Sequence, residues 1–148
     1  MVGGAVNEIG EAELAHALRD GRVVGGVAKG GRRAVQAGVL RKCLRKIQDR
    51  ADPAGFRLEN AFVAGRLDLT GLVIPFPLRF QGCEFEVAPV LEGAQLFELA
   101  LRGGPRLPGL LGNGLRVQRD LDLSGSTVTG ANRTSASTSK TEHVHLAG

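Results

Sequence analysis

A run of basic residues is the segment of this chain best suited to bind a ligand through charge. Arg41, Lys42, Arg45 and Lys46 follow closely on one another. On a helix they would share one half of the surface, which suits the phosphates of nucleic acid or an anionic membrane. Further basic residues flank them at Lys29, Arg32, Arg33 and Arg50. We therefore treat Arg41, Lys42, Arg45 and Lys46 as candidate polyanion contacts.

The glycine-rich segment 25–31, Gly-Gly-Val-Ala-Lys-Gly-Gly, has the look of a phosphate-binding loop. A Walker loop continues with Gly-Lys-Ser/Thr, whereas Gly30 is followed here by Gly31 and Arg32. The Gly-x-Gly-x-x-Gly fingerprint of a dinucleotide site follows no predicted strand either. The sequence thus predicts no cofactor.

Histidines, cysteines and carboxylates occur without the companions that catalysis needs. His143 and His145 lie beside Glu142, but no third metal ligand is identifiable. Cys43 and Cys83 have no histidine next to them in sequence, so we predict two packed, free thiols. Outward-facing carboxylates are expected on strands at Glu59, Asp68, Glu84, Glu92, Asp120 and Asp122. The chain has no Trp or Tyr to stack on a sugar, so we predict solvated carboxylates and neither a catalytic nor a metal site.

The elements that position these residues follow from a repeat. Glycines recur at a nearly constant spacing, at Gly71, Gly82, Gly93, Gly103, Gly114 and Gly125, and Asn60 precedes the first by the same interval. Large apolar residues stand two positions before and three after nearly every one of them, as in Leu78-Arg-Phe-Gln-Gly-Cys-Glu-Phe85. Self-similarity at a fixed period is the signature of a repeat architecture. We predict short strands with one buried face, joined at corners that need positive φ, which asparagine tolerates best after glycine.

Two other architectures have periods close to this one. An 11-residue period also occurs in right-handed helical supercoils, but a glycine in each helix interior would cost about 1 kcal/mol, so we reject a helical fold. A leucine-rich-repeat solenoid is the alternative fold, because two successive units together fit its period. Most units here lack the asparagine that its turn requires.

Four stretches are similar to half of a pentapeptide-repeat unit, in which a small residue lies two positions before a central apolar one: Ala61/Val63, Cys83/Phe85, Ala94/Leu96 and Ser126/Val128. Residues 65–71, Gly-Arg-Leu-Asp-Leu-Thr-Gly, are echoed by Asp-Leu-Asp-Leu-Ser-Gly at 120–125. The stretch 65–130 thus resembles the degenerate pentapeptide-like repeats of bacterial proteins often labelled "membrane-associated oxidoreductase". The resemblance implies a right-handed quadrilateral parallel β-helix with two units per coil. No motif in this sequence supports the activity in that label.

Two helices are predicted ahead of the repeats. Residues 7–20 form the first, with Asn7 as N-cap and Gly21 as its stop. Residues 33–50 form the second, whose apolar face caps the first coil, and residues 23–33 between them are a flexible connection or an irregular strand. The apolar face consists of Val35, Val39, Leu40, Cys43, Leu44 and Ile47.

The predicted fold is therefore mainly β: a short right-handed β-helix solenoid with an N-terminal helical cap. The cap region covers 1–55 and seven 11-residue units cover 56–130. A polar insertion and the start of an incomplete unit cover 131–148. Because the sequence stops at the glycine of a unit, we expect a fragment of a longer protein, a truncated product, or a subunit whose open end a partner closes.

The distribution of charge narrows the choice of function. Residues 1–55 carry ten Lys/Arg against six Asp/Glu, whereas residues 56–128 carry seven against eight. A near-neutral stack argues against mimicry of DNA, which needs a strongly acidic column. The sequence shows neither a transmembrane segment nor a secretory signal, and we predict a cytoplasmic protein.

We predict a non-catalytic scaffold or protein-interaction module. Its partner would bind the side walls or the open C-terminal coil, which also allows self-association. One alternative is binding of nucleic acid or an anionic membrane surface through residues 29–50. The other is the oxidoreductase that the family label names.

Overall fold

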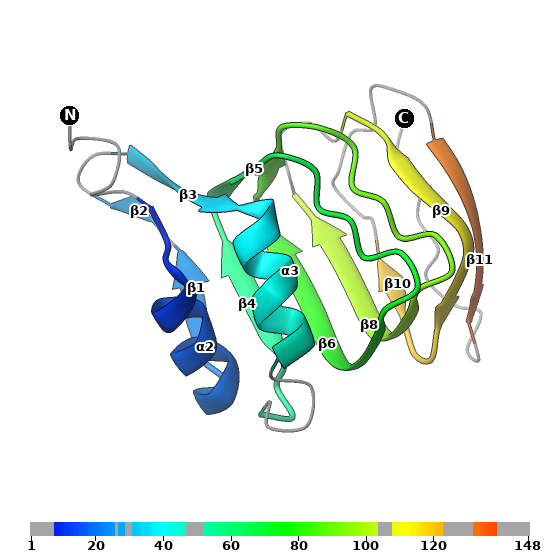
Figure 1. Ribbon diagram of the computed structural model, residues 1–148, viewed down its shortest axis with the longest axis horizontal. Coiled ribbons are helices and arrows are strands. Elements are labelled where there is room, and N and C mark those ends of the chain that lie inside the picture. The colour runs from blue at the N-terminus through cyan, green and yellow to red at the C-terminus, as the bar shows by residue number, and fades with distance from the viewer. Residues whose placement is uncertain are drawn as a thin grey trace.

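The computed structural model describes residues 8–25, 27–28, 31–46, 52–103, 108–122 and 132–138, which form a mainly β protein with parallel sheets and two helices (Figure 1). The helices are α2 (Glu11–Asp20) and α3 (Ala37–Lys46). The strands are β1 (Val23–Gly25), β2 (Val27–Ala28), β3 (Gly31–Gln36), β4 (Phe56–Glu59), β5 (Ala61–Ala64), β6 (Val73–Gln81), β7 (Glu84–Phe85), β8 (Gln95–Arg102), β9 (Leu110–Val117), β10 (Leu121–Asp122) and β11 (Asn132–Thr138). In these residues no helix has the length and apolarity needed to cross a membrane.

The strands belong to two sheets. The larger has the order β1-β4-β6-β8-β9-β11, with β10 also paired to β8, and all its pairs are parallel. The smaller has the order β2-β3-β5-β7, in which only the β2–β3 pair is antiparallel. Figure 1 shows β4, β6 and β8 side by side, with β9 and β11 beyond them.

Within the repeats, each strand pairs with the strand that lies two sequence units further along the chain. Leu58 pairs with Phe80, and Phe80 with Leu101. The same two-unit offset joins residues elsewhere in the unit, such as Ile74 with Leu96. It also holds for Val63↔Phe85, Leu96↔Val117, Asp68↔Val90 and Val90↔Leu111. Alternate units therefore stack on one another.

The predicted apolar positions are buried, which confirms the inward face of the repeat. Leu58 and Ile74 are fully inaccessible, and Phe80 is 2% exposed. The other described positions are buried as well, at Val63, Leu69, Phe85, Leu91, Leu96, Leu101, Gly112 and Val117. Three phenylalanines extend the stacking, because Phe80 packs edge-on against both Phe56 and Phe85, with ring centroids 5.8 and 5.5 Å away.

The predicted corner conformation is also confirmed. Asn60 has φ of 51°, the only positive value at a non-glycine residue in the described chain. Among the glycines, Gly71, Gly82, Gly93, Gly103 and Gly114 have φ between 63° and 72°. Corners stack as the strands do, since the Gly82 N–H donates to the Arg102 carbonyl at 2.8 Å. Gly125 lies outside the described residues.

The predicted helix over 33–50 is wrong at its start. Residues 31–36 form strand β3, and α3 begins only at Ala37. Val35 is fully buried on β3, opposite Val63 of β5. The apolar positions fit a helical wheel equally well, but parallel pairing with β5 satisfies backbone groups that a longer helix would withdraw from the sheet. Of the two alternatives for 23–33, a flexible connection or an irregular strand, β1, β2 and the start of β3 support the strand.

The first helix also begins later than predicted. α2 starts at Glu11 with Gly10 as N-cap, in extended backbone and without a side-chain cap, so the assignment of that role to Asn7 is wrong. The Ile9 N–H donates to the Ala34 carbonyl at 2.7 Å and Ile9 is buried, which holds the backbone extended beside β3. The predicted stop is confirmed, because Gly21 has φ of 69°.

The polar segment after residue 131 continues the sheet. The sequence predicts a polar insertion that interrupts the pattern, whereas the structure shows β11 paired in parallel with β9 from Asn132 to Thr138. The register shifts once, between Ser135 and Ala136. Because a ladder is made of backbone hydrogen bonds, it does not require apolar side chains. Residues 139–148 lie outside the described residues.

One buried cluster joins helices and strands. It contains Leu14 and Leu18 of α2, Leu40 and Leu44 of α3, and the inward residues of the strands. Figure 1 shows both helices near β1 and β4, at one end of the row of strands. The helices therefore cover the end of the larger sheet that its first strands form.

Candidate functional site

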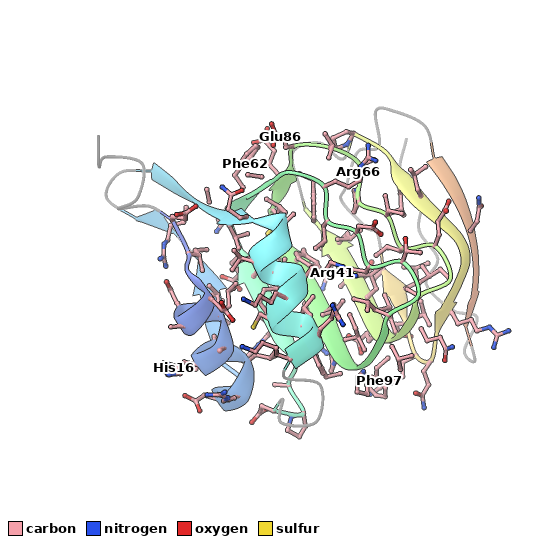
Figure 2. The ribbon with its side chains drawn as sticks, in the orientation of Figure 1. His16, Arg41, Phe62, Arg66, Glu86 and Phe97 are labelled. Atoms are coloured by element: carbon pink, nitrogen blue, oxygen red, sulfur yellow. The ribbon has the colours of Figure 1, made fainter. Side chains whose placement is uncertain are left out.

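Helix α3 carries all four predicted polyanion contacts, but their side chains have different surroundings. The Arg41 Nε donates to the Asp68 carbonyl at 2.9 Å, so this half-buried side chain ties α3 to the repeats (Figure 2). Asp68 is itself held in a turn, because Thr70 donates to it and thereby lowers the pKa of the carboxyl group. Arg41 thus has a structural contact in addition to its charge.

Lys42 and Lys46 share one carboxylate. Their Nζ atoms lie 3.8 and 3.5 Å from the two oxygens of Glu11, at the start of α2. Both lysine side chains are largely exposed, at 63% and 64%. Long, exposed ion pairs contribute little to stability and yield easily to a competing anion. These two lysines therefore remain accessible to a ligand.

Arg45 is exposed on α3 and has no ion pair among the described residues. Arg33, one of the basic residues that flank this run in the sequence, instead forms a bidentate ion pair with Glu13 of α2, both contacts being 2.6 Å. That pair lowers the pKa of Glu13. Lys29 and Arg50 lie outside the described residues, as does the side chain of Arg32. The accessible basic surface is therefore Lys42, Arg45 and Lys46, which we call the α3 basic face.

A groove of about 550 Å³ lies between α2 and α3. Its lining includes His16 and the charged residues Glu11 and Lys46. His16 is exposed, and Figure 2 shows it on the outer side of α2. Cys43 also lines the groove, but burial, followed by the nearby Glu11 charge, raises the pKa of its thiol to about 11. Because a thiolate is the reactive form, Cys43 has a packing role, as the sequence predicted.

The other sequence candidates are placed as follows. Cys83 is a buried free thiol whose Sγ lies 3.3 Å from the Leu58 carbonyl, in agreement with the predicted packing role. Gly25 stacks so closely on Glu59 that a Cβ would overlap the Glu59 carbonyl oxygen, so this glycine serves strand packing. His143, His145 and Glu142 lie outside the described residues. Across the described part of the chain, no three His, Cys, Asp or Glu side chains gather as a metal-binding group.

A charged notch, which the sequence did not predict, opens on the outer face of the larger sheet. It has a volume of about 300 Å³, and Ala100 forms its floor because the register places this short side chain between Arg79 and Asp122. Its other charged residues are Glu98, Arg102 and Asp120. We call these six residues the Ala100 notch.

Two ion pairs cross the Ala100 notch. The Arg79 Nε and Nη2 lie 3.0 and 2.9 Å from Glu98 Oε2, and the Glu98 side chain is only 12% exposed. The Arg102 Nε lies 3.4 Å from Asp122 Oδ2. Sequence reasoning found Asp120 and Asp122 as outward carboxylates, but it missed the arginines and Glu98. The two-unit offset aligns Arg79, Ala100 and Asp122, and this was the signal that could have found the notch.

Comparison with protein-family models, with curated proteins and with solved structures finds no match to this chain.

Proposed function

We propose that this chain is a non-catalytic scaffold that binds a protein partner on its outer wall. In this proposal the wall belongs to a right-handed β-helix of pentapeptide-like repeats. The observation that carries the proposal is the regular two-sided wall: inward positions are apolar and buried, and several outward positions carry charged residues held in register, among them Glu59, Arg79 and Arg102. A rigid surface that presents side chains at fixed spacing is what solenoids use for recognition.

Three features support the β-helix within this proposal. The two-unit offset between paired strands recurs at several separate places in the unit, as expected for successive coils. Residues with positive φ recur where the chain turns between strands. Parallel strands in one sheet are almost always connected with a right-handed crossover, which agrees with the hand that the family resemblance implies.

The scaffold proposal is tested by isolating partners on the immobilised full chain. Cells that express the protein supply the extract. A wall variant, Glu59→Lys with Arg79→Glu, reverses two charges on the outer face of the larger sheet without changing net charge. The matched control, Glu11→Lys with Lys42→Glu, does the same on the two helices. Circular dichroism and urea unfolding show whether each variant folds.

A partner retained by the wild type and the helix variant, but lost by the wall variant, is the expected result. Retention by the wall variant together with loss by the helix variant would instead move the site to the helices. If the folded wild type retains no specific partner, the scaffold proposal is wrong. Bound nucleotide or a cofactor absorbance in the purified protein would favour the oxidoreductase alternative.

A second candidate function is polyanion binding through the α3 basic face. The exposure of Lys42, Arg45 and Lys46 on one helix favours it. We expect such binding to heparin, duplex DNA or phosphatidylserine vesicles to weaken steeply with added salt. The triple alanine variant at these positions should abolish it, whereas Arg22→Ala with Arg79→Ala and Arg116→Ala should not. Equal loss in both triple variants would show non-specific charge attraction.

Self-association is a special case of the scaffold proposal. β11 ends the strand order of the larger sheet among the described residues, and edge strands pair readily with another chain. Size-exclusion chromatography with light scattering tests this directly. A dimer whose fraction rises with concentration would support pairing at this end, and a monomer at all concentrations would contradict it. We also propose a cytoplasmic location, which fractionation of the producing cells can check.

A further inference from the structure

The Ala100 notch has the shape to receive a side chain from outside. On neighbouring strands, the residues level with Ala100 are Arg79 and Asp122, whose long or charged side chains rise on either side of it. Ala100 itself is only 6% exposed although its neighbours Leu99 and Leu101 face the core. A short residue between taller ones thus leaves the hollow of about 300 Å³.

The charges of the notch favour a cation. Arg79 and Arg102 are already paired with Glu98 and Asp122. Asp120 is half-exposed and lines the same hollow, and it has no ion pair among the described residues. Three carboxylates against two guanidinium groups leave one negative charge in excess. An entering anion would meet arginines that are engaged and a carboxylate that is not.

Asp120 and Asp122 are placed to act together. Leu121 between them is buried, so the two aspartates lie on the same outward side of the chain. The Leu99 N–H donates to the Asp120 carbonyl at 3.0 Å, which fixes this backbone against β8. A cation over Ala100 would therefore meet carboxylates on a rigid support.

We propose that the Ala100 notch binds the cationic side chain, lysine or arginine, of a partner protein. The methylene stem of either residue would lie over Ala100, and its charged end would reach Asp120 and Asp122. This inference rests on the proposed scaffold function and names the chemistry of the partner. The source of the cation is a protein partner, because the proposed scaffold function requires one.

The test is a nuclear magnetic resonance titration of the isotope-labelled full chain. The probes are three blocked tripeptides, Gly-Lys-Gly, Gly-Arg-Gly and Gly-citrulline-Gly, the last being a neutral analogue of arginine. We expect the two cationic peptides to shift the amide signals of residues 98–102 and 120–122, with an affinity that falls as salt is added. The neutral analogue should shift them little. The two cationic arms show whether ammonium or guanidinium binds better.

Variants separate charge from shape. Asp120→Asn should weaken binding about fivefold or more, because it removes the unpaired charge. Ala100→Leu should abolish binding by filling the hollow without altering any charge. Glu59→Gln, a matched loss of charge two strands away on the same wall, should leave affinity unchanged. If Ala100→Leu fails to fold, Asp120→Asn against Glu59→Gln still decides the question.

The proposal that the Ala100 notch binds a cation would be overturned if the citrulline peptide caused equal shifts, or if Asp120→Asn and Glu59→Gln had equal effects. Shifts confined to residues of α2 and α3 would overturn it too. If the wild type binds neither cationic peptide but still retains a partner that the wall variant loses, this inference alone is refuted. Cation binding without any wall-dependent partner would refute the scaffold proposal instead.

Discussion

Gly55 and Gly71 have nearly the same backbone conformation, with φ of 77° and 71°, but different surroundings. A Cβ on Gly71 would meet no atom within 4 Å, whereas one on Gly55 would overlap the Pro77 carbonyl oxygen. The pair thus separates the cost of the left-handed conformation from the cost of a close backbone approach.

We predict that Gly71→Ala lowers the free energy of unfolding by about 1–2 kcal/mol, the usual cost of a left-handed non-glycine residue. Gly55→Ala should cost at least about 2 kcal/mol more, because a backbone carbonyl cannot move aside as a side-chain end can. Urea unfolding monitored by circular dichroism measures both values. Equal losses would mean that strands β4 and β6 are not packed as described.

Ionisation of a single side chain, Cys43, makes the free energy of unfolding depend on pH. Its pKa is raised from 9.0 to about 11 in the folded protein, so between these values the unfolded chain loses a proton that the folded chain keeps. Stability should therefore fall as pH rises from about 9 to 11, by about 2–3 kcal/mol at about 1.4 kcal/mol per pKa unit. Cys43→Ala should show a shallower decline over this range. A decline of the same slope in both proteins would contradict the assignment.

At the scale of elements, α2 is fixed to β3 by Glu13 and Arg33. The bidentate pair lowers the pKa of Glu13, so its contribution is complete above the ordinary value of 4.5 and is lost as pH falls through the lowered one. Glu13 is 44% exposed, and solvent screening limits the contribution to about 0.2–1 kcal/mol.

We predict that Glu13→Gln has a free energy of unfolding about 0.2–1 kcal/mol lower than that of the wild type at pH 7. The difference should shrink as the solution is made more acidic than the ordinary glutamate pKa. Urea midpoints at a series of pH values measure it, and Glu59→Gln serves as the control at an outward carboxylate. A difference that stays constant into strong acid would show that the ion pair does not act through Glu13 ionisation.

The elements also show what the sequence could and could not predict. Corner residues and buried positions were predictable because each recurs, so one unit corroborates the next. β3 was not, because Val35 satisfies both a helical wheel and an alternating strand pattern over so short a segment. The Ala100 notch depends on residues from different units, and only the observed register shows that Arg79 and Asp122 flank an alanine.

At the scale of the whole molecule, the proposed coil has a definite length that can be tested by insertion. Duplicating residues 71–92 adds two sequence units, which is the observed offset between paired residues such as Leu58 and Phe80. We expect this protein to fold, with an unfolding midpoint no lower than that of the wild type and a larger denaturant dependence, since more surface becomes buried.

The matched control duplicates residues 71–86, which moves the corner glycines out of register with those of the preceding coil. This variant should lose cooperative unfolding. Its urea transition should be broad, and its amide protons should exchange at nearly uniform rates. Equal stability of the two duplications would contradict a coil of fixed length.

Strands β1 and β3 precede the repeats in the chain and lie beside β4 and β5 in parallel. The segment that precedes the repeats therefore supplies two strand edges on which they can pair, with Glu8 and Ile9 lying against the other side of β3. Each later strand pairs with a strand that lies two sequence units earlier in the chain and has therefore already left the ribosome. The sheets can therefore assemble in the order in which their strands are synthesised.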